Sequence, residues 1–327
     1  MTQLASAWRK IRPVVAPVLT ILIFVLIFRK VPFGRFKEAL AGADYALFFS
    51  ALIPFSVLYF ALDTLVLLAV VRWFHGPINY RDLLPVRAVD YLISVLNHKL
   101  SQGAMVVYLS RRLAASVLEV ASSIFFLDLL QKTHLVLWAT IGMCLVADRA
   151  PKALFFVPFA VAIAWCIFLL YIKGHLQIVG RFLTPPDWRL LRTFRIAPLK
   201  RYVQVLLLKA PLLIASAAVH TYAIRSFGIE LSFLSLLATL PIIFIVGALP
   251  ITIAHLGTTQ AAWIYFHGET DVQASALLAY SLAAHLTFML GNAVLGAAFL
   301  PRAYRELFGD RQLTRAEVSP QKGALSL

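Results

Sequence analysis

The sequence predicts an all-α polytopic integral membrane protein with about 7–9 transmembrane helices, two broken or re-entrant segments and a possible internal inverted repeat. Three observations lead to this class. Hydrophobic residues make up 61% of the 327 residues and charged residues 14%, which is more apolar surface than a soluble core could bury. Apolar runs of about 20 residues, long enough to cross a bilayer, recur along the chain. Two further apolar runs are interrupted by Gly, Pro and polar residues.

The uninterrupted apolar runs predict the regular crossings, with a shorter run at 134–147. The first run follows a basic stretch, as the apolar part of a signal peptide does. No small-residue cleavage site follows it, so we expect a membrane helix that is retained. The long runs lie near residues 13–31, 45–71, 113–130, 153–172, 202–223 and 273–300.

The interrupted segments, 83–109 and 233–266, are the most specialised parts of the sequence. In hydrocarbon, the backbone groups of a broken helix need other partners, so such breaks occur where protein or a water-filled cavity surrounds them. The breaks fall at Asn97 to Gly103 and at Pro250 to Gly257, in corresponding places of the two halves. This pattern is typical of transporters whose binding site lies at the interface of two repeats.

Loop charge predicts the orientation of the second half. The connection 173–201 and the tail from Arg302 are basic, so both are predicted to be cytoplasmic. The chain between them must then cross an even number of times, and segment 233–266 should enter from outside and return. In the first half an inside amino terminus requires 83–109 or its neighbour to cross fully, and charge does not decide this.

The predicted organisation has four parts, and no soluble catalytic domain is expected among them. Those parts are a first membrane half at 1–172, a basic interfacial linker at 173–201, a second membrane half at 202–306 and a disordered cytoplasmic tail at 307–327.

The formal charge of +15 does not indicate a nucleic-acid-binding protein. The Lys and Arg residues cluster between hydrophobic spans, where they orient the chain and attract anionic lipid headgroups. No nucleic-acid-binding module is legible, so no nucleic-acid partner is expected. The sequence also contains no metal-binding, phosphate-loop or nucleophile motif. We therefore expect no catalytic residue, metal or cofactor, although an enzyme using a lipid-linked donor stays open.

Polar residues after each break are candidates for binding a substrate. In the first segment, an Arg fork and a Lys could hold a lipid phosphate, or the same residues could simply reach lipid headgroups at the surface. In the second, the start of a helix could bind an anion, or the residues could form a tight turn. The candidates are Asn97, Lys99, Gln102, Gly103, Arg111 and Arg112, and then His255, Gly257, Thr258 and Gln260.

Ionisable residues inside the apolar runs are candidates of a second kind, because charge is costly within a membrane. Glu119 and Lys209 are the main examples, and Asp63 is another. Glu119 needs a partner such as Lys209 or Arg112 to stay charged. The alternatives are a structural ion pair or a neutral acid.

The order of these motifs resembles the lysylphosphatidylglycerol synthase transmembrane-region family, which is also called flippase-like. The resemblance covers roughly residues 45–300. Its first motif, an Asn followed by a Gly and an Arg-bearing helix, is matched by Asn97, Gly103 and Arg111 or Arg112. In its second motif this chain has His255 where a Gly often stands and Gln260 where a Glu often stands. The cytoplasmic aminoacyltransferase domain of the full-length synthases is expected to be lacking.

The resemblance implies a protein of a bacterial cytoplasmic (inner) membrane that translocates lipids. We expect it to bind an anionic phospholipid or a polyprenyl-phosphate headgroup between the two broken segments. One alternative is a membrane transferase that uses a lipid-linked donor, with Glu119 or Asp90 as its acid. Another is a scaffold whose partner is a separate lipid- or glycan-modifying enzyme.

Overall fold

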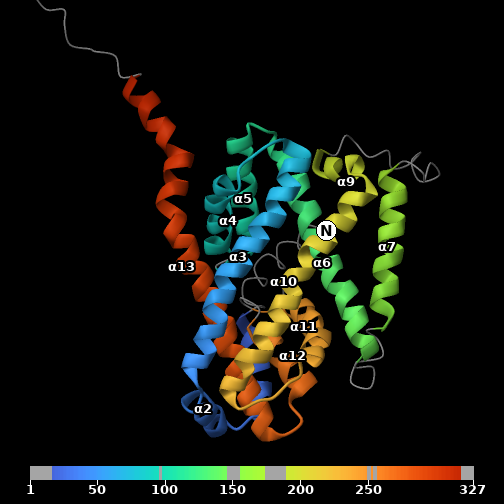
Figure 1. Cartoon of the computed structure of the whole chain (residues 1–327), viewed down its shortest axis with the longest axis vertical. Helices are drawn as coiled ribbons and strands as arrows, with labels where there is room; N and C mark the ends of the chain where they lie inside the picture. Colours follow the sequence, from blue (N-terminus) through green and yellow to red (C-terminus); the bar gives the residue numbers. More distant parts are fainter. Residues whose placement is uncertain are drawn as a thin grey trace, which may run out of the picture.

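The computed structural model of the chain describes residues 17–95, 98–145, 155–173, 189–248, 252 and 256–317 (Figure 1). For residues 98, 99, 145 and 307–317 it describes the course of the backbone alone. Within these ranges all regular structure is helical, which confirms the all-α class.

The chain first forms a helix at Pro17–Lys30, which bends by 91° into the short helix α2 (Phe33–Ala41). The long helix α3 (Tyr45–His75) begins where the Asp44 side chain accepts a hydrogen bond from a first-turn N–H. It ends at Gly76, whose φ of 99° is open to glycine and strained for other residues.

The first interrupted segment is a helical hairpin. Each of its two arms is too short to cross a bilayer of about 30 Å, because an α-helix rises about 1.5 Å per residue. Two more helices complete the first half of the chain. The arms, which we call hairpin 1, are α4 (Tyr80–Ser94) and α5 (His98–Leu113), and the helices that follow are α6 (Val117–Leu145) and α7 (Val157–Ile172).

The second half repeats this order after the short helices at Arg189–Leu191 and α9 (Arg192–Ile196). A long helix is followed by a second hairpin and by another long helix. These elements are α10 (Leu199–Ala223), hairpin 2 with its arms α11 (Phe233–Gly247) and α12 (Thr258–His267), and α13 (Asp271–Glu317). Helix α13 thus continues beyond 306, where the second half was predicted to end.

Four of the described helices are long and apolar enough to cross a membrane, and the bent pair at the amino end could supply a fifth span. Fewer helices meet this criterion than the 7–9 crossings predicted, for three reasons. Runs 113–130 and 134–147 form the single helix α6, both interrupted segments form hairpins, and α7 is only 16 residues long. The polytopic membrane class is confirmed.

The two halves run in opposite directions (Figure 1). Helix α3 runs from the α2 end of the molecule to the α9 end, hairpin 1 lies in the α9 half, and α6 returns. Helix α10 starts at the α9 end, hairpin 2 lies in the α2 half, and α13 returns. The same order of span, hairpin and span therefore occurs twice with inverted direction, as in inverted-repeat transporters.

Segment 233–266 enters and returns at one end of the molecule, as loop charge predicted. In the first half, runs 113–130 and 134–147 form the single helix α6, and segment 83–109 forms hairpin 1.

Each hairpin packs against the closing span of the other half. Helix α13 lies along α4, where a Cβ on Gly296 would meet the Ala88 carbonyl oxygen at 2.6 Å. Helix α6 lies along α11, where a Cβ on Gly142 would meet the Ala238 carbonyl oxygen at 2.0 Å. These two glycine contacts occupy equivalent places in the two halves, so the halves are interlocked.

The outer faces of the long helices are apolar and open. Ile53 on α3, Ile163 on α7 and Leu207 on α10 are each more than half exposed. Exposed apolar side chains on this scale suit contact with lipid rather than with water.

Candidate functional site

Four charged side chains from both halves meet inside the molecule. Asp63 lies on α3, Arg87 and Asp90 on α4, and Lys209 on α10, and all four side chains are at least nine-tenths buried. We call these four residues the charge cluster. With two acids and two bases, it carries no net charge.

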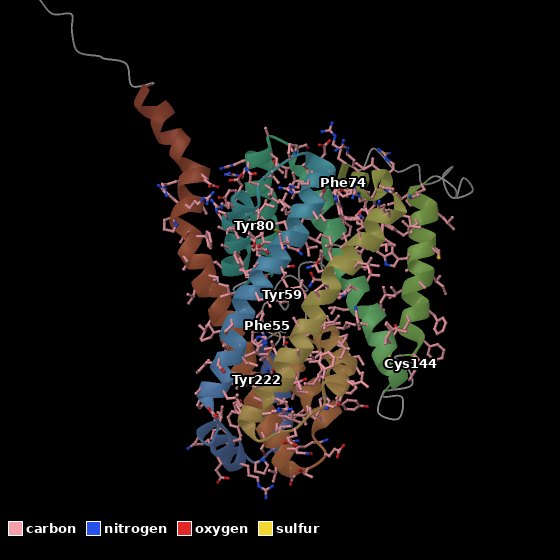
Figure 2. The ribbon with its side chains drawn as sticks, viewed as in Figure 1. Phe55, Tyr59, Phe74, Tyr80, Cys144 and Tyr222 are labelled. Carbon is pink, nitrogen blue, oxygen red and sulfur yellow. The ribbon has the colours of Figure 1, made fainter. Side chains whose placement is uncertain are left out.

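The cluster lies near the middle of the long helices α3 and α10. Asp63 is about 18 Å along α3 from His75, and Lys209 is about 15 Å along α10 from Leu199, at about 1.5 Å per residue. Both distances are measured from the α9 end and are about half of a 30 Å hydrocarbon core. Figure 2 shows Tyr59, one turn before Asp63, at mid-height of the molecule.

Asp63 is the centre of the cluster. Its carboxylate pairs with the Arg87 Nη2 atom at 3.0 Å, accepts a hydrogen bond from Lys209 Nζ, and accepts one from the Tyr91 hydroxyl at 3.2 Å. Lys209 also donates to Gln131 Oε1 on α6 at 2.6 Å. The Asp63–Lys209 bond therefore joins the first spans of the two halves at mid-depth.

The carboxylate of Asp90 accepts fewer hydrogen bonds than that of Asp63. Its Oδ2 atom accepts from Arg87 Nη1 at 3.1 Å, and its Oδ1 atom is buried with no hydrogen-bond partner in the part of the chain that the structure describes. Arg87 Nε and His134 Nε2 on α6 are also buried and without partners. Buried polar atoms are rarely left unpaired, so Asp90 Oδ1 and Arg87 Nε, which belong to one ion pair, are candidates for contact with a ligand or water.

A second ionic network closes the open end of hairpin 1 against α13. Arg112 pairs with Asp82 on α4 at 2.8 Å and with Glu306 on α13 at 2.7 Å. Glu306 also accepts from Arg302 at 2.9 Å and from the Tyr108 hydroxyl at 2.7 Å. These bonds fix both arms of the hairpin to α13.

Beside this network lies a surface depression of about 580 Å³. Two of its lining residues, Arg81 and Arg302, are basic, and Asp82 is acidic. Tyr80, which is labelled in Figure 2, and Asn79 complete the lining.

Hairpin 2 is held by neutral groups. Gly257, with a φ of 90°, caps α12, and its N–H donates to Gln260 Oε1 at 2.6 Å. Gln260 is fully buried, and its Nε2 atom has no partner. Gln260 thus performs the capping that a Glu at the same place can also perform, which gives its departure from the family pattern a structural reason.

The predicted residues of hairpin 1 do not form one group. Arg112 belongs to the network at the open end, and Arg111 lies exposed beside it. Gln102 is half-buried on α5, and a Cβ on Gly103 would meet nothing within 4 Å. Asn97 and the side chain of Lys99 lie outside what the structure describes.

The other predicted residues occupy three separate places. Gly257 packs against the amino-terminal helix, where a Cβ would meet Ile23 at 3.1 Å, and Thr258 and Gln260 follow it in the first turn of α12. Glu119 pairs with Arg192 at 3.3 Å rather than with Lys209 or Arg112. His255 lies outside the described residues. Lys209 belongs to the charge cluster, together with Asp63, also named as an ionisable residue in an apolar run, and Asp90, named as a possible transferase acid.

Sequence reasoning missed Arg87 as a site residue. The run from Val86 to Tyr91 places Arg87, Asp90 and Tyr91 on neighbouring turns of an interrupted apolar segment. An Arg and an Asp three residues apart face the same side of a helix. The three-residue spacing of Arg87 and Asp90, together with Asp63 and Lys209 in neighbouring spans, was the sequence signal for a cluster with equal numbers of acids and bases.

A family model described as the lysylphosphatidylglycerol synthase TM region matches residues 13–296. The match confirms the resemblance seen in the motifs and places the chain among membrane proteins of lipid metabolism or transport. No curated protein and no solved structure matches the chain.

Proposed function

We propose that this chain, which belongs to the lysylphosphatidylglycerol synthase transmembrane-region family, translocates a lipid across the cytoplasmic membrane of a bacterium. The lipid carries an anionic headgroup, either that of a phospholipid or a polyprenyl phosphate. The headgroup binds between hairpin 1 and hairpin 2, and its acyl or prenyl chains stay in the bilayer.

The observation that carries this proposal is the charge cluster at mid-depth, built from both halves of an inverted arrangement. Ionisable residues within a membrane are expensive and typically line substrate or ion pathways. Here the two hairpins enter from opposite ends, so movement of one half against the other would expose the region between them to each side in turn.

The basic end of hairpin 1 supports recognition of an anion. Arg81 and Arg302 line the surface depression, and a headgroup phosphate can pair with an Arg fork. The sequence also offers Asn97, Lys99 and Gln102 from segment 83–109, and Gly257 and Thr258 from hairpin 2. These residues remain the proposed headgroup contacts within the membrane.

Reconstitution tests the translocation directly. The protein is inserted into vesicles of phosphatidylethanolamine and phosphatidylglycerol that contain a trace of fluorescent phosphatidylglycerol, or of fluorescent polyprenyl phosphate. A reductant added outside then bleaches the label in the outer leaflet only. We expect the bleached fraction to rise above one half for at least one probe with the wild-type protein, and equal bleaching in protein-free vesicles would contradict the proposal.

A variant links that activity to the cluster. Arg87→Gln removes the charge that binds both Asp63 and Asp90, so we expect translocation to fall at least tenfold. Glu119→Gln is the matched control, because it also removes one charge from a helix but affects only the outlying pair with Arg192. Equal rates for the two variants would remove the cluster from the proposed pathway.

Asp90 is the residue that favours a second candidate function, that of a transferase with a lipid-linked donor. Its unpartnered Oδ1 atom is a free acceptor of the kind a general base needs. Incubation of the pure protein with labelled polyprenyl-phosphate sugar and membrane lipids tests this function. A product that disappears in Asp90→Asn would support transfer, and the absence of product with the wild-type protein would exclude it for that donor.

A further inference from the structure

We propose that Asp90 carries one proton together with each anionic headgroup, so that translocation is coupled to the proton gradient. This proposal rests on the lipid translocation proposed above and adds its energy source. It starts from the charge balance of the cluster and from the unequal bonding of its two acids.

The charge balance requires a counter-ion for the headgroup. Asp63, Asp90, Arg87 and Lys209 sum to zero, so a headgroup with one negative charge would leave the site with a net charge of −1. A net charge at mid-depth is strongly unfavourable. Uptake of one proton restores neutrality, and the proton and the headgroup therefore favour each other's binding.

Of the two acids, Asp90 is the one placed to accept this proton. Asp63 accepts bonds from Lys209, Arg87 and Tyr91, and these donors hold it in its charged form. Among the described residues Asp90 accepts from Arg87 alone, and no described atom bonds its buried Oδ1 atom. Protonation converts the carboxylate of Asp90 to a carboxylic acid and forms one O–H bond.

The same step prepares Arg87 for a phosphate. Once Asp90 is neutral, the Nη1 donor of Arg87 is released from its ion pair, and the Nε donor has no partner to begin with. Two N–H groups of one guanidinium are then available to phosphate oxygens, while Nη2 stays with Asp63. The proton thus binds Asp90 and the headgroup binds Arg87, which are the two partners of one ion pair.

The surroundings of Asp90 favour a proton over a metal cation. Among the described residues no group of three His, Cys, Asp or Glu side chains could hold a metal ion, and Oδ1 is a single oxygen. On its own helix Asp90 has Arg87 and Tyr91 as neighbours. The titratable groups linked to the cluster from the surrounding elements are Asp63 and Tyr59 on α3, Lys209 on α10, and His134 on α6, which lies near Lys209.

His134 is the competing proton acceptor, since its Nε2 atom is also buried without a partner. A proton on His134 would place a third positive charge beside Lys209, whereas a proton on Asp90 removes a negative one. Both neutralise a bound headgroup, so the two residues must be separated by variants. His134→Gln is expected to keep the coupling, and Asp90→Asn is expected to abolish it.

Proton uptake on binding is the first measurement. Dioctanoyl phosphatidylglycerol is added to the pure protein in weakly buffered detergent at neutral pH, and a dye reports the pH while calorimetry reports the binding. We expect one proton taken up per lipid bound by the wild type and by Glu119→Gln, and none by Asp90→Asn. Binding without uptake in the wild type, or undiminished uptake in Asp90→Asn, would overturn the inference.

The second measurement uses the vesicles of the translocation assay with an imposed pH gradient. One proton per headgroup predicts up to a tenfold change in the ratio of probe between the leaflets for each pH unit, because both free energies scale as RT ln 10. Asp90→Asn should leave that ratio at its value without a gradient. Translocation that ignores the gradient would refute the coupling but leave the proposed function standing. A wild type that binds lipid with proton uptake yet moves none would refute the proposed function and the coupling of transport, and would leave only proton uptake on binding.

Discussion

Hairpin 1 and hairpin 2 occupy equivalent places in the two halves but differ in chemistry. The arms of hairpin 1 contain seven Asp, Lys and Arg residues, and the arms of hairpin 2 contain no Asp, Glu, Lys or Arg. Hairpin 1 is held by ion pairs to α3 and α13, whereas hairpin 2 is held by apolar packing, a glycine contact and a cap. The two hairpins therefore share a backbone arrangement but not the same chemistry. Their charged side chains are concentrated in hairpin 1.

The largest expected effect comes from breaking the bond that joins the halves at the charge cluster. Lys209→Met leaves three buried charges that no longer balance, and removing one partner of a buried pair typically costs about 3–5 kcal/mol. We expect this loss in the free energy of unfolding measured in mixed micelles. Adding Asp63→Asn restores neutrality and should recover part of the loss. A single variant as stable as the wild type would show that the cluster is not a structural bond between the halves.

The two glycine contacts test whether the hairpins are held in the same way. Gly142→Ala and Gly296→Ala both place a Cβ against a backbone carbonyl, at 2.0 and 2.6 Å, and overpacking of this kind costs about 1–3 kcal/mol. We expect both to lower the thermal midpoint in detergent, Gly142→Ala more than Gly296→Ala.

Gly103→Ala is the matched control for these two variants. Its added Cβ meets nothing within 4 Å, and Ala favours a helix over Gly by up to about 1 kcal/mol. The thermal midpoint should stay unchanged or rise. If the thermal midpoint of Gly103→Ala falls as far as those of Gly142→Ala and Gly296→Ala, close contact of the glycine with a backbone carbonyl is not the cause of the loss.

A smaller effect is expected at the cap of hairpin 2. Gln260→Ala removes the acceptor for the Gly257 N–H and should cost about 1 kcal/mol. Gln260→Glu keeps that acceptor, and because the site is fully buried its carboxyl group should be protonated, so it should lose less stability than Gln260→Ala. Chemical denaturation measures the free energy of unfolding of both variants. A loss in Gln260→Ala that Gln260→Glu does not share would assign Gln260 to capping rather than to substrate contact. Equal losses would show that the hydrogen bond to the Gly257 N–H does not stabilise the fold.

The smallest effect is expected at the open end of hairpin 1. Arg112 is one-quarter exposed, and exposed ion pairs contribute about 0–1 kcal/mol and weaken with salt. Arg112→Gln should therefore change stability by less than about 1 kcal/mol, and less still in high salt. Arg87→Gln, within the buried cluster, should show a larger loss with little salt dependence. Similar salt profiles would contradict this contrast between buried and exposed pairs.

Much of the fold could be predicted from the sequence, because hydrophobic length and loop charge act locally. The return of segment 233–266 to one end followed from the basic residues on both sides of it. That runs 113–130 and 134–147 form one helix could not be predicted, because Asp128 and Lys132, at the junction of the two runs, resemble a loop. On α6 these two residues pair one turn apart, and the helix continues through them.

The candidate site could be predicted only in part. Lys209 was found because a charge in an apolar run is conspicuous. Asp63 was named for the same reason, but its pairing with Lys209 and Arg87 depends on how α3, α4 and α10 pack, and residues 24 to 146 positions apart leave no local pattern. Arg112 was assigned to a substrate because its structural partner, Glu306, lies 194 residues away.

The packing of α4 against α13 also has a consequence for biosynthesis. Helix α4 emerges from the ribosome long before α13, because Leu92 and its neighbour Gly296 are about 200 residues apart, or about 10–40 s at usual rates of synthesis. Lys209, the nearer counter-charge from the second half, arrives about halfway through that interval. The most highly charged hairpin of the chain must therefore wait in the insertion machinery for its neighbours, and α13, the last span made, completes its enclosure.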